Sequence, residues 1–544
     1  MGPDWPLRKV PDELVRRYYR ERLWTDETLA DLVWEGLTVH PELTFRVWSG
    51  LRPVHTTIGD VRARALRLAG GLEARGFATG DVVAFQIPNW IEAAVTFYGV
   101  SLLGGVLVPV VHFYGPKELR HILRESRARV LITADRFGHN DYLAGLASMR
   151  ADLPDLELVV VAGDSAAPPE TVSFDALLDD DGIDRPRAVD PDAPAVVGYT
   201  SGTTANAKGV VHSHRTLVAE LHQITDMNAT PSGRPMLVGA PVGHAIGMQA
   251  GLLNPLVRGL SVHLTDVWDP GTVLAAMLEA ELTAGSGSTY FLQSLLDHAS
   301  CTDRHHGLMG AIGLGGSSIP AAVADRAEAL GISLTRSYGS TEHPSTTGAS
   351  HEEPRAKRNY TDGRALPGVD LRIVDEHGRD VATGTPGEIW SRGPDLCVGY
   401  VEQTLTDVAF DPEGWYASGD IGVLDETGYL TITDRKKDII IRGGENVSAA
   451  EVEELLLRMP GVAEAAVVAG PDARMGEHVC AFIRTRPGQP APTLPDVRAH
   501  LERAGLARQK WPEELHGVDD LPRTPSGKVK KFVLRQQLRD GAGR

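Results

Sequence analysis

Helix-like and strand-like segments alternate along the chain from about Asp60, and this alternation restricts the possible folds more than any other feature. The amphipathic pattern of residues 60–76 predicts a helix that ends at glycine, and residues 81–89 follow as a buried strand. The alternation of helix and strand continues through residues 90–105, 106–111, 116–128 and 129–134. Such alternation is typical of parallel sheets whose faces are covered by helices.

The second half of the chain changes character. A strand at 260–266 and a helix at 270–280 resume the pattern, and shorter strands dominate after Leu371. A dense charge run at Thr433–Ile441 separates two apolar strands and marks the clearest boundary. Beyond it lies a small unit of helices and strands.

We therefore predict an α/β fold. Its large N-terminal domain would hold two helix-covered sheet subdomains and a β-rich subdomain, followed by a small, mobile α+β C-terminal domain. The predicted boundaries are 1–433 for the large domain, 434–438 for a hinge and 439–544 for the small domain.

Charge and cysteine content exclude several classes of protein. The 544 residues carry a formal net charge of −18, which argues against a nucleic-acid partner because polyanions require basic surfaces. Only three cysteines occur and none has CxxC spacing, so a disulfide framework is not expected.

No apolar run approaches the roughly 20 residues of a membrane helix, and no signal-peptide core is present. We expect a cytoplasmic protein without integral membrane contact, whose oligomeric state the sequence leaves open.

The segment YTSGTTANAKGV, Tyr199–Val210, combines hydroxyl residues, glycine and lysine. Backbone N–H groups and hydroxyls in such a turn suit phosphate oxygens, and Lys208 adds a point charge. The Walker pattern GxxxxGK[ST] is absent, because no glycine precedes Lys208. Taken alone, the segment is equally well interpreted as a polar loop between a strand ending at Thr200 and a helix beginning near His214.

Four later segments also carry residues suited to nucleotide chemistry. They are GLGGSSIP (Gly313–Pro320), SYGSTEHP (Ser337–Pro344), WYASGDIG (Trp415–Gly422) and LPRTPSGKVKK (Leu521–Lys531). Each has an ordinary alternative, such as a glycine turn at a strand end, a surface carboxylate or a solvated basic tail.

Taken in order, the five segments resemble the motifs of the acyl-adenylate-forming superfamily, in its acyl-CoA synthetase branch. The resemblance spans roughly residues 50–544. Tyr199–Gly209 is similar to the signature [YT]-[ST]-S-G-T-T-G-x-P-K-G, with Ala205 in place of glycine and Ala207 in place of proline. These two exchanges alter the conformational freedom of the loop.

The resemblance implies an ATP site built from all five segments. Tyr338 would stack on adenine, and Asp420 and Arg435 would bind the ribose. The implied ATP- and AMP-binding residues are Thr200, Ser201, Gly202, Thr203, Thr204, Lys208, Gly315, Gly316, Ser317, Tyr338, Gly339, Asp420 and Arg435.

The same resemblance implies the reacting groups. Thr341 would meet the α-phosphate, Glu342 would bind Mg²⁺, and Lys528 would contact the substrate carboxylate and the α-phosphate. His244 would gate or line the acyl pocket. Lys437 occupies the hinge position, and Gly443, Gly444 and Glu445 match a loop that faces the active site during thioester formation with CoA.

The acyl pocket is expected to include His244, Met248, Tyr290, Ser340 and His343. The segment 241–256 contains no carboxylate that could pair with an α-ammonium group, which argues against an amino-acid substrate. The small apolar residues favour a medium-chain, alicyclic or aromatic acid.

CoA is the expected acceptor of the acyl group. A stand-alone adenylating enzyme that loads a carrier protein remains an alternative, as does a non-catalytic nucleotide-binding relative. A metal site at Cys301, His305 and His306 is not expected, because no fourth ligand lies nearby in the sequence.

Overall fold

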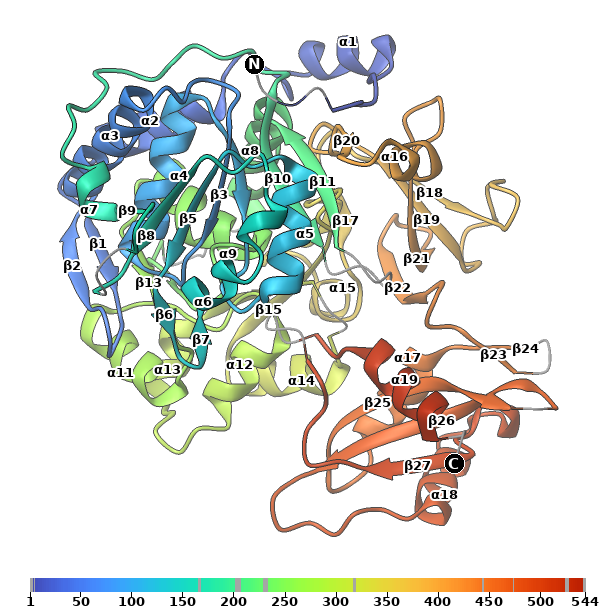
Figure 1. Cartoon of the computed structure of the whole chain (residues 1–544). Helices are drawn as coiled ribbons and strands as arrows, with labels where there is room; N and C mark the ends of the chain where they lie inside the picture. The colour runs from blue at the N-terminus through green and yellow to red at the C-terminus, as the bar shows by residue number, and fades with distance from the viewer. Residues whose placement is uncertain are drawn as a thin grey trace.

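Eight strands form the largest sheet of the computed structural model, in the order β20-β11-β10-β4-β3-β5-β8-β9 (Figure 1). The structure describes residue 3 and residues 5–164, 168–200, 207–227, 233–316, 319–442, 445–472, 474–523 and 528–541. The strands of this sheet are β3 (Val82–Gln86), β4 (Val106–Pro109), β5 (Val130–Ala134), β8 (Leu158–Ala162), β9 (Val172–Ser173), β10 (Pro194–Thr200), β11 (Lys208–Ser213) and β20 (Gly399–Tyr400).

The six strands from β10 to β9 pair in parallel, as the alternating pattern predicts. At the other edge β11 and β20 pair antiparallel. The alternative interpretation of Tyr199–Val210, a polar loop between a strand and a helix, missed strand β11, which forms a hairpin with β10 before helix α8 (His214–Met227) begins. Val210 and Val211 of β11 are fully buried, and this burial favours the extra strand.

Local sequence accounts for the helices beside this sheet, α3 (Ile58–Ala74), α4 (Ile91–Leu103) and α5 (Pro116–Ser126). Thr57 and Asp60 form a capping box at the start of α3. Helix α4 ends at Gly104, whose φ of 72° lies in the left-handed region that favours glycine. Every side chain of α4 is buried, and α4 belongs to the largest apolar core.

Two smaller sheets complete the helix-covered part. One has the order β12-β13-β1-β2 and the other β14-β15-β16-β17. Their strands are β1 (Thr44–Val47), β2 (Val54–Thr57), β12 (Leu237–Val238), β13 (Val262–Leu264), β14 (Ala311–Leu314), β15 (Ser333–Tyr338), β16 (Thr347–Gly348) and β17 (Arg364–Ala365). Nearby helices are α2 (Leu29–Val39), α9 (Ala245–Met248), α11 (Pro270–Ala280), α12 (Thr289–Leu296), α13 (Asp303–Met309), α14 (Ala321–Ala329) and α15 (Arg355–Tyr360).

A four-stranded antiparallel sheet, β18-β19-β21-β22, forms the predicted β-rich part. Its strands are β18 (Asp370–Val374), β19 (Gly387–Arg392), β21 (Tyr416–Leu424) and β22 (Leu430–Arg435). In Figure 1 this sheet stands to the side of the helix-covered body, above the C-terminal unit.

The C-terminal unit is an α+β sandwich of one sheet between helices. Its sheet has the order β24-β23-β26-β25, and β27 also pairs with β26. The elements are β23 (Ile440–Arg442), β24 (Glu445–Val447), α17 (Ala449–Leu457), β25 (Val462–Asp472), β26 (Gly476–Thr485), α18 (Leu494–Arg503), β27 (Glu514–Gly517) and α19 (Lys531–Gly541). Helices α17 and α18 pack on one face, and α19 packs on the other.

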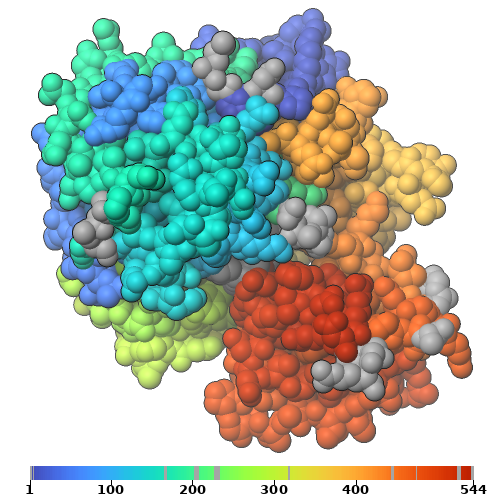
Figure 2. Space-filling view, viewed as in Figure 1, coloured from blue at the N-terminus to red at the C-terminus, as the bar shows by residue number. Residues whose placement is uncertain are grey.

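The C-terminal unit touches the large body (Figure 2). One contact is the hydroxyl of Ser448, which donates to the carbonyl oxygen of Thr433 at 3.5 Å. Residues 436–439 connect β22 to β23, and the role of residues 434–438 as a hinge stays a prediction. Among the described residues, no helix is long and apolar enough to cross a membrane.

Candidate active site

The β10–β11 hairpin brackets the predicted phosphate loop. Thr200 and Lys208 are directly paired across the two strands. The predicted loop residues Ser201, Gly202, Thr203 and Thr204 lie outside the described residues. The carbonyl oxygen of Ala207, which replaces the signature proline, lies 2.8 Å from Nε2 of His121. The hairpin thus presents the Lys208 side chain beside the next strand, β20.

The turn after β15 positions Thr341 and Glu342. The backbone of Pro344 passes so close to residue 339 that only glycine fits, since a Cβ on Gly339 would lie 1.8 Å from the carbonyl oxygen of Pro344. Nε2 of His212, on β11, lies 2.7 Å from the Thr341 carbonyl oxygen. A carbonyl only accepts hydrogen bonds, so this nitrogen carries the proton. The hairpin and the turn are therefore held in one arrangement.

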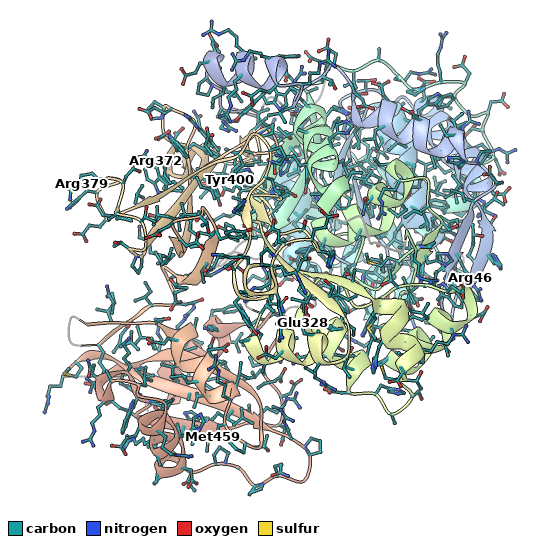
Figure 3. All side chains as sticks on the ribbon, turned by 180° about the vertical axis from the view of Figure 1, so that it is seen from behind. Arg46, Glu328, Arg372, Arg379, Tyr400 and Met459 are labelled. Atoms are coloured by element: carbon teal, nitrogen blue, oxygen red, sulfur yellow. The ribbon has the colours of Figure 1, made fainter. Side chains whose placement is uncertain are left out.

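Tyr400 links Glu342 to Lys208. The Tyr400 hydroxyl donates to Oε1 of Glu342 at 2.8 Å. The Lys208 ammonium lies 5.7 Å from the centre of the Tyr400 ring, within reach of a cation–π interaction. Figure 3 shows Tyr400 where the β-rich sheet approaches the helix-covered body. The sequence patterns gave no signal for this tyrosine.

Tyr338, Asp420 and Arg435 form a connected group. The Tyr338 hydroxyl donates to Oδ2 of Asp420 at 2.8 Å, and Nε of Arg435 lies 3.1 Å from Oδ1. Asp420 and Arg435 are paired residues of β21 and β22. The two residues predicted to bind the ribose therefore stand side by side, next to the residue predicted to stack on adenine.

Lys528 reaches this group from the C-terminal unit. Its Cε lies 4.0 Å from the position that a Cβ on Gly316 would occupy, and Gly316 has a φ of 72°. Arg435, Asp420 and Glu342 all lie close enough to influence its charge. Burial and then the positive charge of Arg435 lower the pKa of Lys528 to about 8. Of the neighbouring glycine segment, Gly315 is described and Ser317 lies outside the described residues.

A small internal cavity lies beside Thr341. It encloses about 30 Å³, which is room for little more than a water molecule. Its lining residues include the predicted His244 and Met248, together with Pro109, Val196, Leu217, Glu220, Gln249 and Pro344. Burial and then the charge of Lys528 lower the pKa of His244 to about 4, so its imidazole is neutral at pH 7.

Glu220 is a cavity residue that the motifs missed. It lies on α8 with 1% of its surface exposed, and its Oε1 accepts hydrogen bonds from Gln249 and Ser345. Burial and then the charge of Asp395 raise the pKa of Glu220 well above its usual range. The segment 241–256 has no carboxyl group, but α8 places one in the same cavity. The amphipathic pattern of α8 would place a glutamate on the protein surface, so the sequence did not predict that Glu220 lines a cavity.

The other three predicted pocket residues lie elsewhere around the site. Tyr290, on α12, is 43% exposed and is not among the residues that line this cavity. The Ser340 hydroxyl accepts the N–H of His343. The buried His343 ring lies 2.7 Å from the hydroxyl of Ser391 and 3.1 Å from Oδ1 of Asp395. In this structure His343 therefore contacts the β-rich sheet and the segment that follows β19.

The segment predicted as a hinge is tied to the last helix. Oδ1 of Asp438 lies 2.7 Å from the Arg535 guanidinium on α19, and burial lowers the pKa of the neighbouring Lys437. Gly443 and Gly444 lie outside the described residues, and only the backbone of Glu445 is described. Lys531, interpreted as part of a solvated basic tail, is instead paired with Glu453 at 2.8 Å.

Cys301, His305 and His306 do not form a cluster of metal ligands among the described residues. Nδ1 of His305 accepts the N–H of Thr302 at the start of α13, and its Nε2 lies 3.2 Å from the carbonyl oxygen of Leu274. These contacts occupy both ring nitrogens of His305.

Comparison with known proteins decides the family. The AMP-binding enzyme family matches residues 34–401, and the AMP-binding enzyme C-terminal domain matches residues 451–528. The chain belongs to the AMP-binding enzyme family. The predicted acyl-adenylate-forming superfamily, in its acyl-CoA synthetase branch, is confirmed, and so is the enzyme class of AMP-forming acid–CoA ligases. ATP and CoA are the substrates of that class.

Relatives in the family match nearly the whole chain. A medium-chain fatty-acid–CoA ligase of Escherichia coli (strain K12) is 33% identical over 99% of this chain and 96% of its own length. The 3-[(3aS,4S,7aS)-7a-methyl-1,5-dioxo-octahydro-1H-inden-4-yl]propanoyl:CoA ligase of Rhodococcus jostii (strain RHA1) is 34% identical over 89% of this chain and 94% of its own.

Solved structures of the family agree with the fold. The anthranilate CoA ligase AuaEII in complex with anthranoyl-AMP matches with a TM-score of 0.84 and 25% identity, over 96% of this chain and 99% of its own. The predicted α/β fold, with a large N-terminal and a small C-terminal domain, is confirmed. The exact domain boundaries and the individual residue roles stay predictions.

Proposed function

We propose that this enzyme activates a hydrophobic carboxylic acid, medium-chain, alicyclic or aromatic, as an acyl-adenylate and then transfers the acyl group to CoA. AMP and pyrophosphate are the other products. The relatives above support this substrate class, because their names cover a medium-chain acid, a fused-ring acid and an aromatic acid.

The observation that carries the proposal is the convergence of distant segments on one place. Lys528 comes from the C-terminal unit and lies against Gly316, with Glu342 and Asp420 close by. Three of these residues are charged, and together they offer an ammonium group and two carboxylates around one space. An ammonium group such as that of Lys528, held beside the substrate carboxylate and the α-phosphate, is suited to stabilise the negative charge that develops during the reaction.

The proposed first step joins the acid to the nucleotide. A carboxylate oxygen attacks the α-phosphorus of ATP, a P–O bond forms, and the bond to the pyrophosphate leaving group breaks. Lys528 would balance the charge on the phosphorus centre, while Thr200 and Lys208 would hold the outgoing phosphates. Asp420 would accept hydrogen bonds from ribose hydroxyls, because its two oxygens offer about four acceptor sites and Tyr338 and Arg435 each use one.

Glu342 fits a magnesium site by its chemistry. Mg²⁺ prefers oxygen ligands and is usually held by one or two carboxylates together with substrate phosphates. Glu342 supplies such a carboxylate, and the hydroxyl of Tyr400 orients it from one side. The bound ion would neutralise phosphate charge.

The proposed second step uses CoA. The thiol sulfur attacks the carbonyl carbon of the acyl-adenylate, AMP leaves with the bonding electrons as the thioester forms, and the thiol proton passes to solvent. We propose that residues 434–438 act as the hinge between a large domain, 1–433, and a small domain, 439–544, and that Gly443, Gly444 and Glu445 then face the acceptor. The ion pair between Asp438 and Arg535 would link the hinge segment to α19 during this movement.

The acid would enter the cavity lined by His244 and Met248. At about 30 Å³ this cavity must widen before an acid fits, and the apolar Leu217 and Val196 suit a hydrocarbon body. Glu220 adds one polar group. Burial and then the charge of Asp395 raise its pKa, which favours the neutral form of this carboxyl group over the charged form.

The test is pyrophosphate release with ATP and Mg²⁺ across a panel of carboxylic acids, with and without CoA. Release that depends on a hydrophobic acid, with conversion of CoA to its thioester, supports the proposal. Acid-dependent release without a thioester indicates a carrier-protein acceptor. No release with any acid contradicts catalysis and makes nucleotide binding by a non-catalytic relative the next measurement.

A further inference from the structure

Four side chains with metal-binding atoms gather on one face of the C-terminal sheet, away from the residues discussed above. Strands β26 and β27 pair in parallel, with Cys480 opposite Glu514 and Phe482 opposite His516. Side chains two residues apart on a strand share a face. His478, Cys480, Glu514 and His516 therefore project from the same face, the one that α19 covers beyond them.

The donor atoms lie close to one another. Those of Cys480, Glu514 and His516 all fall within 4.8 Å of each other. Nε2 of His478 lies 3.0 Å from one oxygen of Glu514, and Nε2 of His516 lies 2.8 Å from the other. Two imidazoles thus point their outer nitrogens at one carboxylate, beside a thiol.

Packing holds both imidazole rings in place. The His516 ring stacks on Phe482 with 4.6 Å between centroids and 14° between planes. The His478 ring lies over Gly470 on β25, where a Cβ would come within 2.5 Å of its Cε1. Cys480 is fully buried, whereas the Glu514 side chain is 42% exposed. One end of the cluster is therefore enclosed by protein, and the other end is open to solvent.

We propose that His478, Cys480, Glu514 and His516 bind one Zn²⁺ ion. Two imidazole nitrogens, one thiolate and one carboxylate oxygen form a tetrahedral ligand set that Zn²⁺ accepts readily. Tetrahedral bonds of about 2.0–2.3 Å bring donors to roughly 3.5 Å from each other, so the donor atoms of Cys480, Glu514 and His516 need only small side-chain adjustments. His478, which lies 3.0 Å from Glu514, would join them by a larger movement of its side chain. The thiol proton of Cys480 passes to solvent as the sulfur–zinc bond forms.

Zn²⁺ binds the deprotonated sulfur, and a thiolate in the fully buried surroundings of Cys480 needs a neighbouring positive charge. The metal would therefore supply the positive charge that makes the thiolate stable.

The site's location gives it a structural consequence. β27 ends at Gly517, and the chain then runs through Leu521 to Lys528. A metal bound between β26 and β27 would hold β27, the strand that precedes the segment of Lys528, against β26. It would stabilise the C-terminal unit without contacting the residues proposed for catalysis.

Titration of the metal-free, untagged full-length protein tests the proposal, first with Zn²⁺ by calorimetry and then with Co²⁺ by absorption. We expect about one site per chain, a near-ultraviolet thiolate-to-cobalt band and the intense visible bands of tetrahedral Co²⁺. Zn²⁺ should bleach the cobalt bands and raise the Tm. Absence of the thiolate band in the wild-type protein would overturn the proposal.

Variants locate the site. Cys480→Ala should abolish the thiolate band, and His516→Asn and His478→Asn should each weaken Zn²⁺ binding by about 100-fold, since even outer partners of metal ligands contribute 10–100-fold. Cys301→Ser is the matched control and should bind like wild type. Cys480 is buried, so Cys480→Ala could fail to fold. His516 is partly exposed, and the His516→Asn variant then still tests the site. Equal zinc affinity in His516→Asn and wild type contradicts the assignment.

Discussion

Lys528 shows how one side chain can carry a proposed reaction step. Its ammonium is placed near Asp420 and Glu342 by a segment that starts in another structural unit. The neighbouring basic residues have different environments, because Lys531 is paired with Glu453 whereas Lys530 makes a backbone contact with Pro522. This difference makes Lys530 a suitable control for Lys528.

Replacing Lys528 with alanine should reduce acyl-adenylate formation by about 10²–10³-fold, the usual effect of removing one group that stabilises transition-state charge. Thioester formation from supplied acyl-adenylate should largely survive. Acid-dependent pyrophosphate release and thioester formation measure the two steps separately. Lys530→Ala should match wild type in both, and an equal loss of both steps in Lys528→Ala would contradict its role.

The lowered pKa of Lys528 predicts a pH dependence. The charged ammonium is the active form, so kcat/KM for adenylation should fall as pH rises through about 8, the pKa of Lys528 in the free enzyme. Lys528→Arg keeps its charge at these pH values. That variant should be slower but should lack the decline, and a decline unchanged in Lys528→Arg would assign the titration to another group.

The burial and raised pKa of Glu220 lead to a prediction about which acids the cavity accepts. Glu220→Gln keeps the shape and the hydrogen-bonding capacity of a protonated carboxyl group, so activity on unsubstituted hydrophobic acids should change by less than about threefold. kcat/KM over the acid panel measures this. A loss above about 100-fold, confined to acids that carry an ammonium group, would show that Glu220 acts as a charged partner, and the hydrophobic-acid proposal would then fail.

Strand β20 illustrates what short elements contribute. It is only two residues long, yet it brings Tyr400 against Glu342 and Lys208. No periodic pattern identifies a two-residue strand, and pairing with β11 creates it only in the folded protein. The longer helices α3, α4 and α5 were predictable because their apolar periodicity and end signals lie within each segment.

Tyr400→Phe should weaken the hold on Glu342 and so raise the Mg²⁺ concentration needed for half-maximal adenylation by about tenfold, the low end of the effect of losing a partner of a metal ligand. Adenylation rates over a magnesium titration measure it. Tyr360→Phe removes an exposed hydroxyl that bonds Asp325 and should leave the titration unchanged. An unaltered magnesium requirement in Tyr400→Phe would separate Tyr400 from the proposed metal site.

The arrangement of the two units suits the first step of the proposed reaction. Lys528 lies against Gly316, which is the placement that its proposed role in adenylation requires. Thioester formation would require residues 443–445 at the same place, which one fixed orientation cannot provide. A change of backbone angles near Lys437 would supply the rotation.

Lys437→Pro should therefore slow thioester formation by about 100-fold, with adenylation reduced much less, because proline fixes φ near −65° and prevents the rotation. Single-turnover measurements of each step distinguish the two. Lys437→Ala removes the same side chain but leaves the backbone free, so it should retain most of both activities. Equal loss of thioester formation in the alanine variant would assign the effect to the side chain instead.

The sequence by itself determined the family, the order of the motifs and most long helices and strands. These features depend on local periodicity, caps and short contiguous patterns. Asp420 and Arg435 were also predictable as neighbours, since a single strand pair spans the interval between them.

Only the tertiary structure decided the hairpin strand β11, the Tyr400 contact with Glu342, the burial of Glu220 and the cluster around Cys480. Each joins residues far apart in the chain, and burial or hydrogen bonding with a distant partner determines its chemistry. His478, Cys480, Glu514 and His516 look like ordinary residues of separate strands in the sequence, because only the parallel register of β26 and β27 brings their side chains together.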